Sequence, residues 1–115
     1  MLEVVLWLFE KVNTFPKKQR FVLGQQIENS ALLSLRYIIQ ANNANVKSGG
    51  ATLKGLDELN VELEVLRSLL RVAYELHFLK SESLGYAISQ IDEVGKMRGG
   101  WAKRYKSPNS SKSDN

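Results

Sequence analysis

The chain of 115 residues contains no cysteine and a single histidine, His77. The absence of cysteine excludes a disulfide framework, a thiolate zinc site and a cysteine nucleophile, and it is compatible with a reducing cytoplasm. His77 has no visible nucleophile or carboxylate partner and no further ligands at matched spacing, so neither catalysis nor metal binding is indicated. We expect a histidine that is satisfied inside a helical core or at its end.

Long hydrophobic runs are also missing. Residues 1–9 are apolar apart from Glu3, but this segment is too short to span a bilayer, which takes about 20 residues. It also lacks the basic start and small-residue cleavage site of a signal peptide. The segment is therefore interpreted as a core helix, and we expect a soluble, cytoplasmic protein with no membrane contact.

Alternating apolar and polar residues, the pattern of a half-buried strand, are absent throughout, whereas helical spacing recurs along the chain. Short connections between four helices favour an all-α fold, an antiparallel four-helix bundle covering residues 1–106. The polar stretch 107–115 contains no apolar residue, so we expect it to be disordered. The helices are expected at residues 2–13, 19–43, 56–79 and from 81 onward, with one long loop at 42–55.

The third helix carries two apolar stripes, about 110° apart around its axis at 100° per residue. The first is a heptad-like seam suited to the bundle core: Leu56, Leu59, Leu63, Leu66, Leu70, Ala73 and His77. A monomer rarely exposes so much contiguous apolar surface, so the second stripe predicts an oligomer interface. The alternative is that this helix is central and buried on both sides. The second stripe consists of Val65, Leu69, Val72, Leu76 and Leu79.

Signatures of catalysis are missing as well. Glu58 and Glu62 lie four residues apart, but no Glu-x-x-His pair accompanies them, and acids at the start of a helix complement its dipole. The segment 48–52 lacks the lysine and following helix of a phosphate-binding loop. We therefore expect a non-catalytic protein without a cofactor or a metal.

Positive charge is concentrated in two segments without acids. The net charge is +4 with a pI near 9.4; residues 11–20 contain four cations, and residues 95–112 contain six. A basic surface of this kind suits an acidic partner such as nucleic acid. The segment 93–105 adds three glycines, a tryptophan and a tyrosine. The candidate contacts from these segments are Lys17, Lys18, Arg20, Lys96, Arg98, Lys103 and Arg104.

Arg67 and Arg71 lie one turn apart on the narrow polar strip of the third helix. Two guanidinium groups on one face can each bind two phosphate oxygens. The spacing equally allows local ion pairs, Arg67 with Glu64 and Arg71 with Glu75. On spacing alone, the local pairs are favoured.

Three segments of the chain are distinctive: FPKKQRFVLGQQIE (15–28), LRSLLRVAYEL (66–76) and EVGKMRGGW (93–101). In sequence and in order they resemble segments of the accessory variability determinant (Avd) proteins of diversity-generating retroelements. The last is the most specific, since the first also resembles the four-helix proteins of ribosomal intervening sequences. The resemblance spans roughly residues 2–106.

The resemblance implies a basic four-helix bundle that assembles as a barrel-shaped homopentamer and has no catalytic activity. It further implies binding to the element's reverse transcriptase and to template RNA, possibly also DNA, in support of mutagenic cDNA synthesis and retrohoming. The family's arginine pair matches Arg67 and Arg71, which makes these two the leading contacts. The alternative function is a protein-interaction scaffold of the intervening-sequence type with no retroelement role.

Overall fold

The computed structural model describes the backbone of residues 1–47 and 49–105 and the side chains of residues 1–42 and 55–96. Helices joined by short turns make up its described part, which contains no strand, as the spacing predicts. The helices are α1 (Leu2–Val12), α2 (Lys17–Gln19), the π-helical segment η1 (Arg20–Gly24), α3 (Gln25–Lys47), α4 (Gly49–Glu75) and α5 (Ser81–Tyr105). The predicted tail at 107–115 lies outside the described residues.

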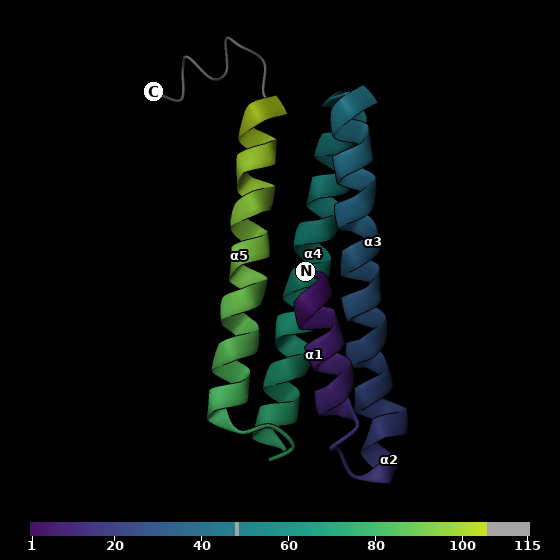
Figure 1. Cartoon of the computed structure of the whole chain (residues 1–115), viewed down its shortest axis with the longest axis vertical. Coiled ribbons are helices and arrows are strands. Elements are labelled where there is room, and N and C mark those ends of the chain that lie inside the picture. The colour runs from purple at the N-terminus through teal and green to yellow at the C-terminus, as the bar shows by residue number, and fades with distance from the viewer. Residues whose placement is uncertain (48, 106–115) are drawn as a thin grey trace.

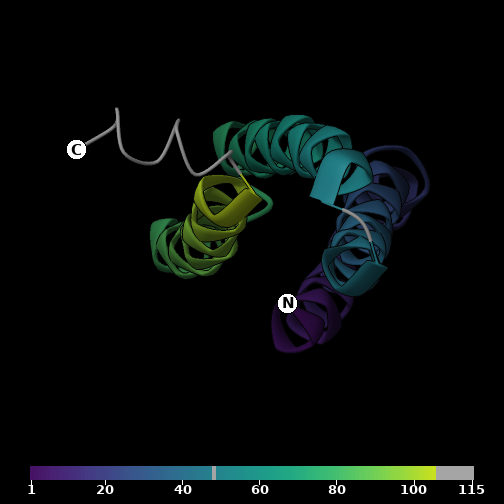
Figure 2. The ribbon, with the colours of Figure 1, turned by 90° about the horizontal axis from the view of Figure 1, so that it is seen from above.

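The long helices α3, α4 and α5 lie side by side along the molecule, and the shorter α1 packs beside the lower half of α3 (Figure 1). Seen from above, the helices follow an open arc in the order α5, α4, α3 and α1 (Figure 2). The end of α1, the short α2 and the connection between α4 and α5 share the lower end of the molecule. This arrangement brings residues near positions 12, 17 and 80 to one end.

The expected core seam on α4 is confirmed up to Ala73. Its six residues from Leu56 to Ala73 are at most 1% exposed. Five of them, from Leu59 to Ala73, form one core cluster with Val4, Val5 and Leu8 of α1 and with buried apolar residues of α3 and α5. Two serines that the apolar pattern did not identify also lie inside: Ser30 Oγ donates a 2.6 Å hydrogen bond to Glu62 Oε2, and Ser34 Oγ donates to the Ser30 carbonyl oxygen. The first of these bonds ties α3 to α4.

The prediction of a long loop at 42–55 is wrong. Helix α3 continues to Lys47 and α4 begins at Gly49, so the two helices meet at residue 48. Glycine costs a helix about 1 kcal/mol relative to alanine, and asparagine costs less. Packing along a neighbouring helix outweighs such local preferences. The buried Ala41 and Leu56, each 1% exposed, mark where α3 and α4 pack on either side of this segment.

The chain becomes helical again at Lys17, two residues before the expected start of the second helix at residue 19. Pro16 has an extended backbone and its carbonyl oxygen accepts hydrogen bonds from the amides of Gln19 and Arg20, so α2 begins at Lys17. The first helix ends before Phe15 and Pro16, as predicted. From Lys17 to Lys47 the chain is one continuous helix, in which α2 and α3 are joined by the π-helical turn η1 at Arg20–Gly24.

Gly24 is required by the close approach of α1 to this π-helical turn. A Cβ atom at residue 24 would lie 2.6 Å from Val12 Cγ1, too close for either to stay in place, so the Val12 side chain or the backbone would have to shift. We expect Gly24→Ala to lower the free energy of unfolding by about 1–3 kcal/mol, the usual cost of overpacking. Urea denaturation followed by circular dichroism measures this change.

Gly85 provides the matched control for Gly24. It lies in α5, and a Cβ atom added there would meet no atom within 4 Å. Gly85→Ala should therefore raise the free energy of unfolding by up to about 1 kcal/mol, because alanine has the better helix propensity. Equal effects of the two substitutions would contradict the assignment of Gly24 to a close contact.

The α4 helix ends earlier than expected, and His77 does not continue its core seam. His77 is exposed and has a left-handed backbone with φ 70°. The Phe78 amide donates to the Ala73 carbonyl oxygen at 2.8 Å and the His77 amide to that of Tyr74 at 2.9 Å. These are the two hydrogen bonds of a Schellman motif, in which glycine normally occupies the left-handed position.

We therefore expect His77→Gly to stabilise the protein. A non-glycine residue in the left-handed region costs about 1–2 kcal/mol, and glycine removes this cost. Glycine also has more conformational entropy in the unfolded state, which offsets part of the gain in stability. The expected gain is about 0.5–1 kcal/mol in the free energy of unfolding, measured by thermal or urea denaturation. His77→Ala keeps the backbone cost and should change stability little. A His77→Gly protein that is less stable than the parent would show that the imidazole itself is needed.

Candidate functional site

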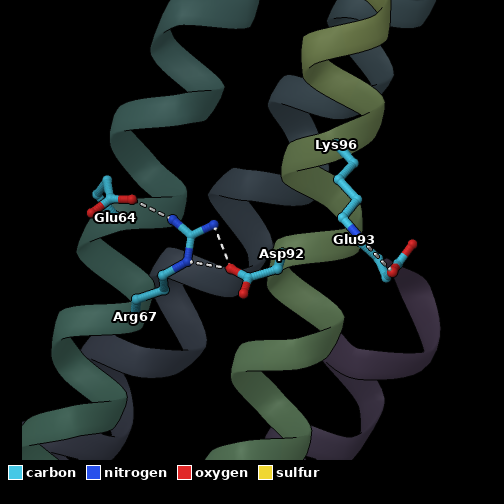
Figure 3. A network of polar contacts seen from close by, with 5 residues as sticks. All are labelled: Glu64, Arg67, Asp92, Glu93 and Lys96. Carbon is cyan, nitrogen blue, oxygen red and sulfur yellow. Dashed lines mark hydrogen bonds and ion pairs between the residues drawn. The ribbon is translucent and has the colours of Figure 1, made fainter.

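Arg67 joins α4 to α5 through two carboxylates. Its Nε donates a 3.0 Å hydrogen bond to Asp92 Oδ1, its Nη2 lies 3.0 Å from the same oxygen, and its Nη1 donates to Glu64 Oε1 (Figure 3). The Arg67 side chain is 20% exposed. The local pair with Glu64 is therefore present, as the spacing favoured, and the contact with Asp92 is an addition that spacing within one helix could not reveal. Arg67 is occupied by the protein's own acids.

Gly95 leaves room for this guanidinium. A Cβ atom at residue 95 would lie 3.4 Å from Arg67 Nη2, at the short edge of ordinary van der Waals contact. The group that packs against Gly95 is the end of the Arg67 side chain. Spacing within a single helix does not reveal this contact, because Gly95 lies on α5 and Arg67 on α4.

Arg71 differs from Arg67 in both exposure and pairing. It is exposed, and the structure gives it no hydrogen bond or ion pair within its described part; the alternative pair with Glu75 is not formed. Arg71 lines a shallow groove between α4 and α5 together with Asp92 and Lys96. Since Asp92 is held by Arg67, Arg71 is the arginine of the pair that is available to a ligand.

Lys96 lies farther along α5, exposed, with its Nζ 3.4 Å from Glu93 Oε1 (Figure 3). The pair joins residues one turn apart, and pairs as exposed as this one contribute little to stability. Lys96 is thus accessible but partly neutralised. The other three predicted contacts on α5, namely Arg98, Lys103 and Arg104, lie outside the described side chains.

Lys17, Lys18 and Arg20 lie at the lower end of the molecule, where α2 begins, and all three are exposed. None of the three forms an ion pair within the part of the chain that the structure describes. They come from α2 and η1, whereas Arg71 and Lys96 line the groove between α4 and α5. Within one chain the predicted contacts therefore form two groups, a basal group at α2–η1 and a lateral group at the α4–α5 groove.

The apolar face predicted on α4 is exposed in part. Val65, Val72 and Leu76 are 41%, 46% and 51% exposed, and Leu69 is half-buried. Leu79 is placed differently from the prediction, because it lies beyond the end of α4 and is buried in the chain's own core at 6% exposure. Full burial of the helix, the alternative explanation of the second stripe, is thereby contradicted for the three exposed residues.

Val61 belongs to the same face, although it was not part of the predicted stripe. It is 61% exposed and lies one turn before Val65. At 100° per residue, the five positions fall within an arc of about 80°. We call them the α4 face: Val61, Val65, Leu69, Val72 and Leu76.

A family model described as bAvd-like matches residues 1–105. The chain belongs to the Avd-like family. No curated protein and no solved structure matches the sequence. The resemblance to Avd proteins seen in the sequence is thus confirmed over nearly the whole chain.

Two of the Avd-like segments contact each other in the fold. The segment 66–76 supplies Arg67 from α4, and the segment 93–101 supplies Gly95 from α5, beside the Arg67 guanidinium. The third segment, 15–28, contains Gly24 at its contact with Val12. The glycines in these segments, as far as their surroundings are described, serve helix packing.

Among the residues whose side chains the structure describes, no three or more histidines, cysteines or acids are placed to hold a metal ion together. None of the described helices is long and apolar enough to cross a membrane. Further exposed apolar residues lie outside the α4 face and were not predicted as a surface: Leu2, Leu6, Phe21, Val22, Leu32, Ile39 and Tyr86.

Proposed function

We propose that the chain is a non-catalytic accessory protein of a diversity-generating retroelement, which binds the element's reverse transcriptase and its template RNA in the cytoplasm. The membership of residues 1–105 in the Avd-like family carries this proposal. Four of the predicted contacts have no ion pair among the described residues, namely Lys17, Lys18, Arg20 and Arg71. They support the proposal because they can contact phosphates without breaking internal ion pairs.

The proposed mechanism is positioning rather than chemistry. Antiparallel bundles assemble through their α4 faces into a ring, a homopentamer by family resemblance, and each copy adds its basal and lateral cations to a shared surface. Phosphate contacts of this type are independent of sequence, so one surface can follow a template as the polymerase moves. In this way the assembly holds the RNA, and possibly DNA, beside the reverse transcriptase during mutagenic cDNA synthesis and retrohoming.

Co-purification with a reverse transcriptase of a diversity-generating retroelement, co-expressed with this protein, tests the proposal. The tagged, assembled protein is expected to retain the enzyme, and RNA is expected to co-elute and to be lost as the salt concentration rises. A nuclease-treated sample separates protein contact from RNA bridging. If no reverse transcriptase is retained with or without nuclease, and the protein instead binds acidic protein regardless of nuclease, an interaction scaffold replaces the retroelement role.

A further inference from the structure

A small hollow at the lower end of the molecule is lined by two lysines from different elements. It lies between the end of α1, the α4–α5 connection and the first turn of α5, and its volume is about 250 Å³. We call it the basal pocket. Its lining residues are Lys11, Thr14, Phe78, Leu79, Lys80 and Ser83.

The basal pocket has no carboxylate among its lining residues. The groove between α4 and α5 contains Asp92 and Glu93, and the hollow between α3 and α4 contains Asp57, Glu58 and Glu62. The hollows beside Arg20 and His77 contain Glu28 and Glu75, respectively. A small anion in the basal pocket therefore has two lysines and no carboxylate among its lining residues, and Lys80 also borders the hollow that contains Glu75.

Lys11 is held in place before any ligand arrives. Its Nζ lies 5.5 Å from the centroid of the Trp7 ring, within cation–π range, and the Trp7 ring packs on Tyr86 of α5 at 4.8 Å. Lys11 is half-buried. Because part of its freedom is already lost, less conformational entropy opposes a contact with a ligand.

Lys80 and Ser83 complete the polar lining. Lys80 is exposed, and neither lysine forms an ion pair within the described residues. The Thr14 hydroxyl donates its hydrogen to the Lys11 carbonyl oxygen at 2.6 Å, which leaves the two ammonium groups and the Ser83 hydroxyl as donors. Phe78 and Leu79 supply apolar walls.

We propose that the basal pocket binds a backbone phosphate of the nucleic acid. Its volume lies below the roughly 300–1,000 Å³ of sites for drug-sized ligands, so it suits a single small group. Lys17 and Lys18 are exposed at the same end of the molecule and can contact neighbouring phosphates of the strand. The anion chemistry follows from the pocket, and the choice of nucleic acid as its source rests on the proposed function.

Two variants of the full-length protein test the pocket. Lys11→Gln combined with Lys80→Gln removes both cations. Ser83→Asp places a carboxylate in the lining at the third residue of α5, where an acid complements the helix dipole and should preserve folding. Asn29→Asp, at an exposed position on α3, adds the same charge away from the pocket and serves as the control.

Binding is measured by fluorescence anisotropy with a labelled single-stranded oligouridylate over a series of salt concentrations. Both pocket variants are expected to weaken binding about tenfold at low salt, the loss of one charge-assisted contact. Loss of one phosphate contact should also reduce the slope of log K against log salt by about 0.7. The control should change affinity less than about twofold. Pocket variants that retain the parent's affinity and slope would overturn the proposal.

A titration of the parent protein with inorganic phosphate, followed by amide chemical shifts, separates the pocket from the proposed function. Shifts at Thr14, Lys80 and Ser83 are expected, and they should vanish in the double lysine variant. If the parent binds RNA while these amides do not respond and the variants bind normally, the pocket fails and the proposed function stands. If phosphate shifts these amides but RNA never binds, both the nucleic-acid occupant and the proposed function are contradicted.

Discussion

Val65→Lys combined with Val72→Lys is expected to convert the proposed homo-oligomer into folded monomers. Both residues are more than 40% exposed in the single chain, so lysine there can reach solvent without disturbing the core. In an assembly that buries the α4 face, the same ammonium groups would lose water without gaining partners. The effective cost is several kcal/mol per buried charge, enough to dissociate most interfaces.

Sedimentation velocity measures the assembly, and circular dichroism confirms that the helices remain. Gly85→Lys combined with Ser89→Lys adds the same charge to exposed positions on α5 and should leave the assembly intact. A Val65/Val72 variant that sediments like the parent would exclude the α4 face from the interface. A parent protein that is monomeric at every concentration would remove the need for an interface there.

Arg71→Ala is expected mainly to weaken RNA binding and Arg67→Ala mainly to lower folding stability, although the two residues are only one turn apart. Arg71 is exposed and unpaired within the described residues, so its loss should change the free energy of unfolding by less than about 0.5 kcal/mol. It should weaken RNA binding about tenfold, because one charge-assisted contact is worth about 1.5 kcal/mol.

Arg67→Ala should lower the free energy of unfolding by about 1–2 kcal/mol, between the values for exposed and buried pairs. The reason is that it separates α4 from Asp92 of α5 and leaves Glu64 without its partner. RNA affinity, measured where both proteins are folded, should change less than for Arg71→Ala. A larger loss of affinity for Arg67→Ala at unchanged stability would restore Arg67 as a direct contact.

Helical periodicity predicted most of the fold because burial repeats with the helical turn. The α4 seam is the clearest case, since its spacing placed six residues in the core correctly. The prediction of a loop at 42–55 was wrong because local residue propensity does not include packing against a neighbouring helix. The prediction that His77 continues the core seam was wrong because α4 ends before it. The left-handed residue after a helix is usually glycine, so a histidine there gives no recognisable signal of the helix end.

The candidate site was less accessible to sequence reasoning, because availability depends on partners from other helices. Arg67 and Arg71 look equivalent along one helix, and only Asp92 on α5 distinguishes them. Leu79 fits the apolar stripe by spacing, but α4 ends before it, and the chain turns it into the core. The basal pocket joins residues about 70 positions apart, which no local pattern reveals.

The most direct test of the proposed role is RNA binding by the assembled parent protein across a salt series. Binding is expected at low salt for unrelated single-stranded sequences, with affinity falling steeply and linearly in log salt, because the proposed contacts are to phosphates. A slope that corresponds to several phosphates per strand would agree with a shared basic surface. Absence of RNA binding by the assembled protein at low salt would contradict the proposed role.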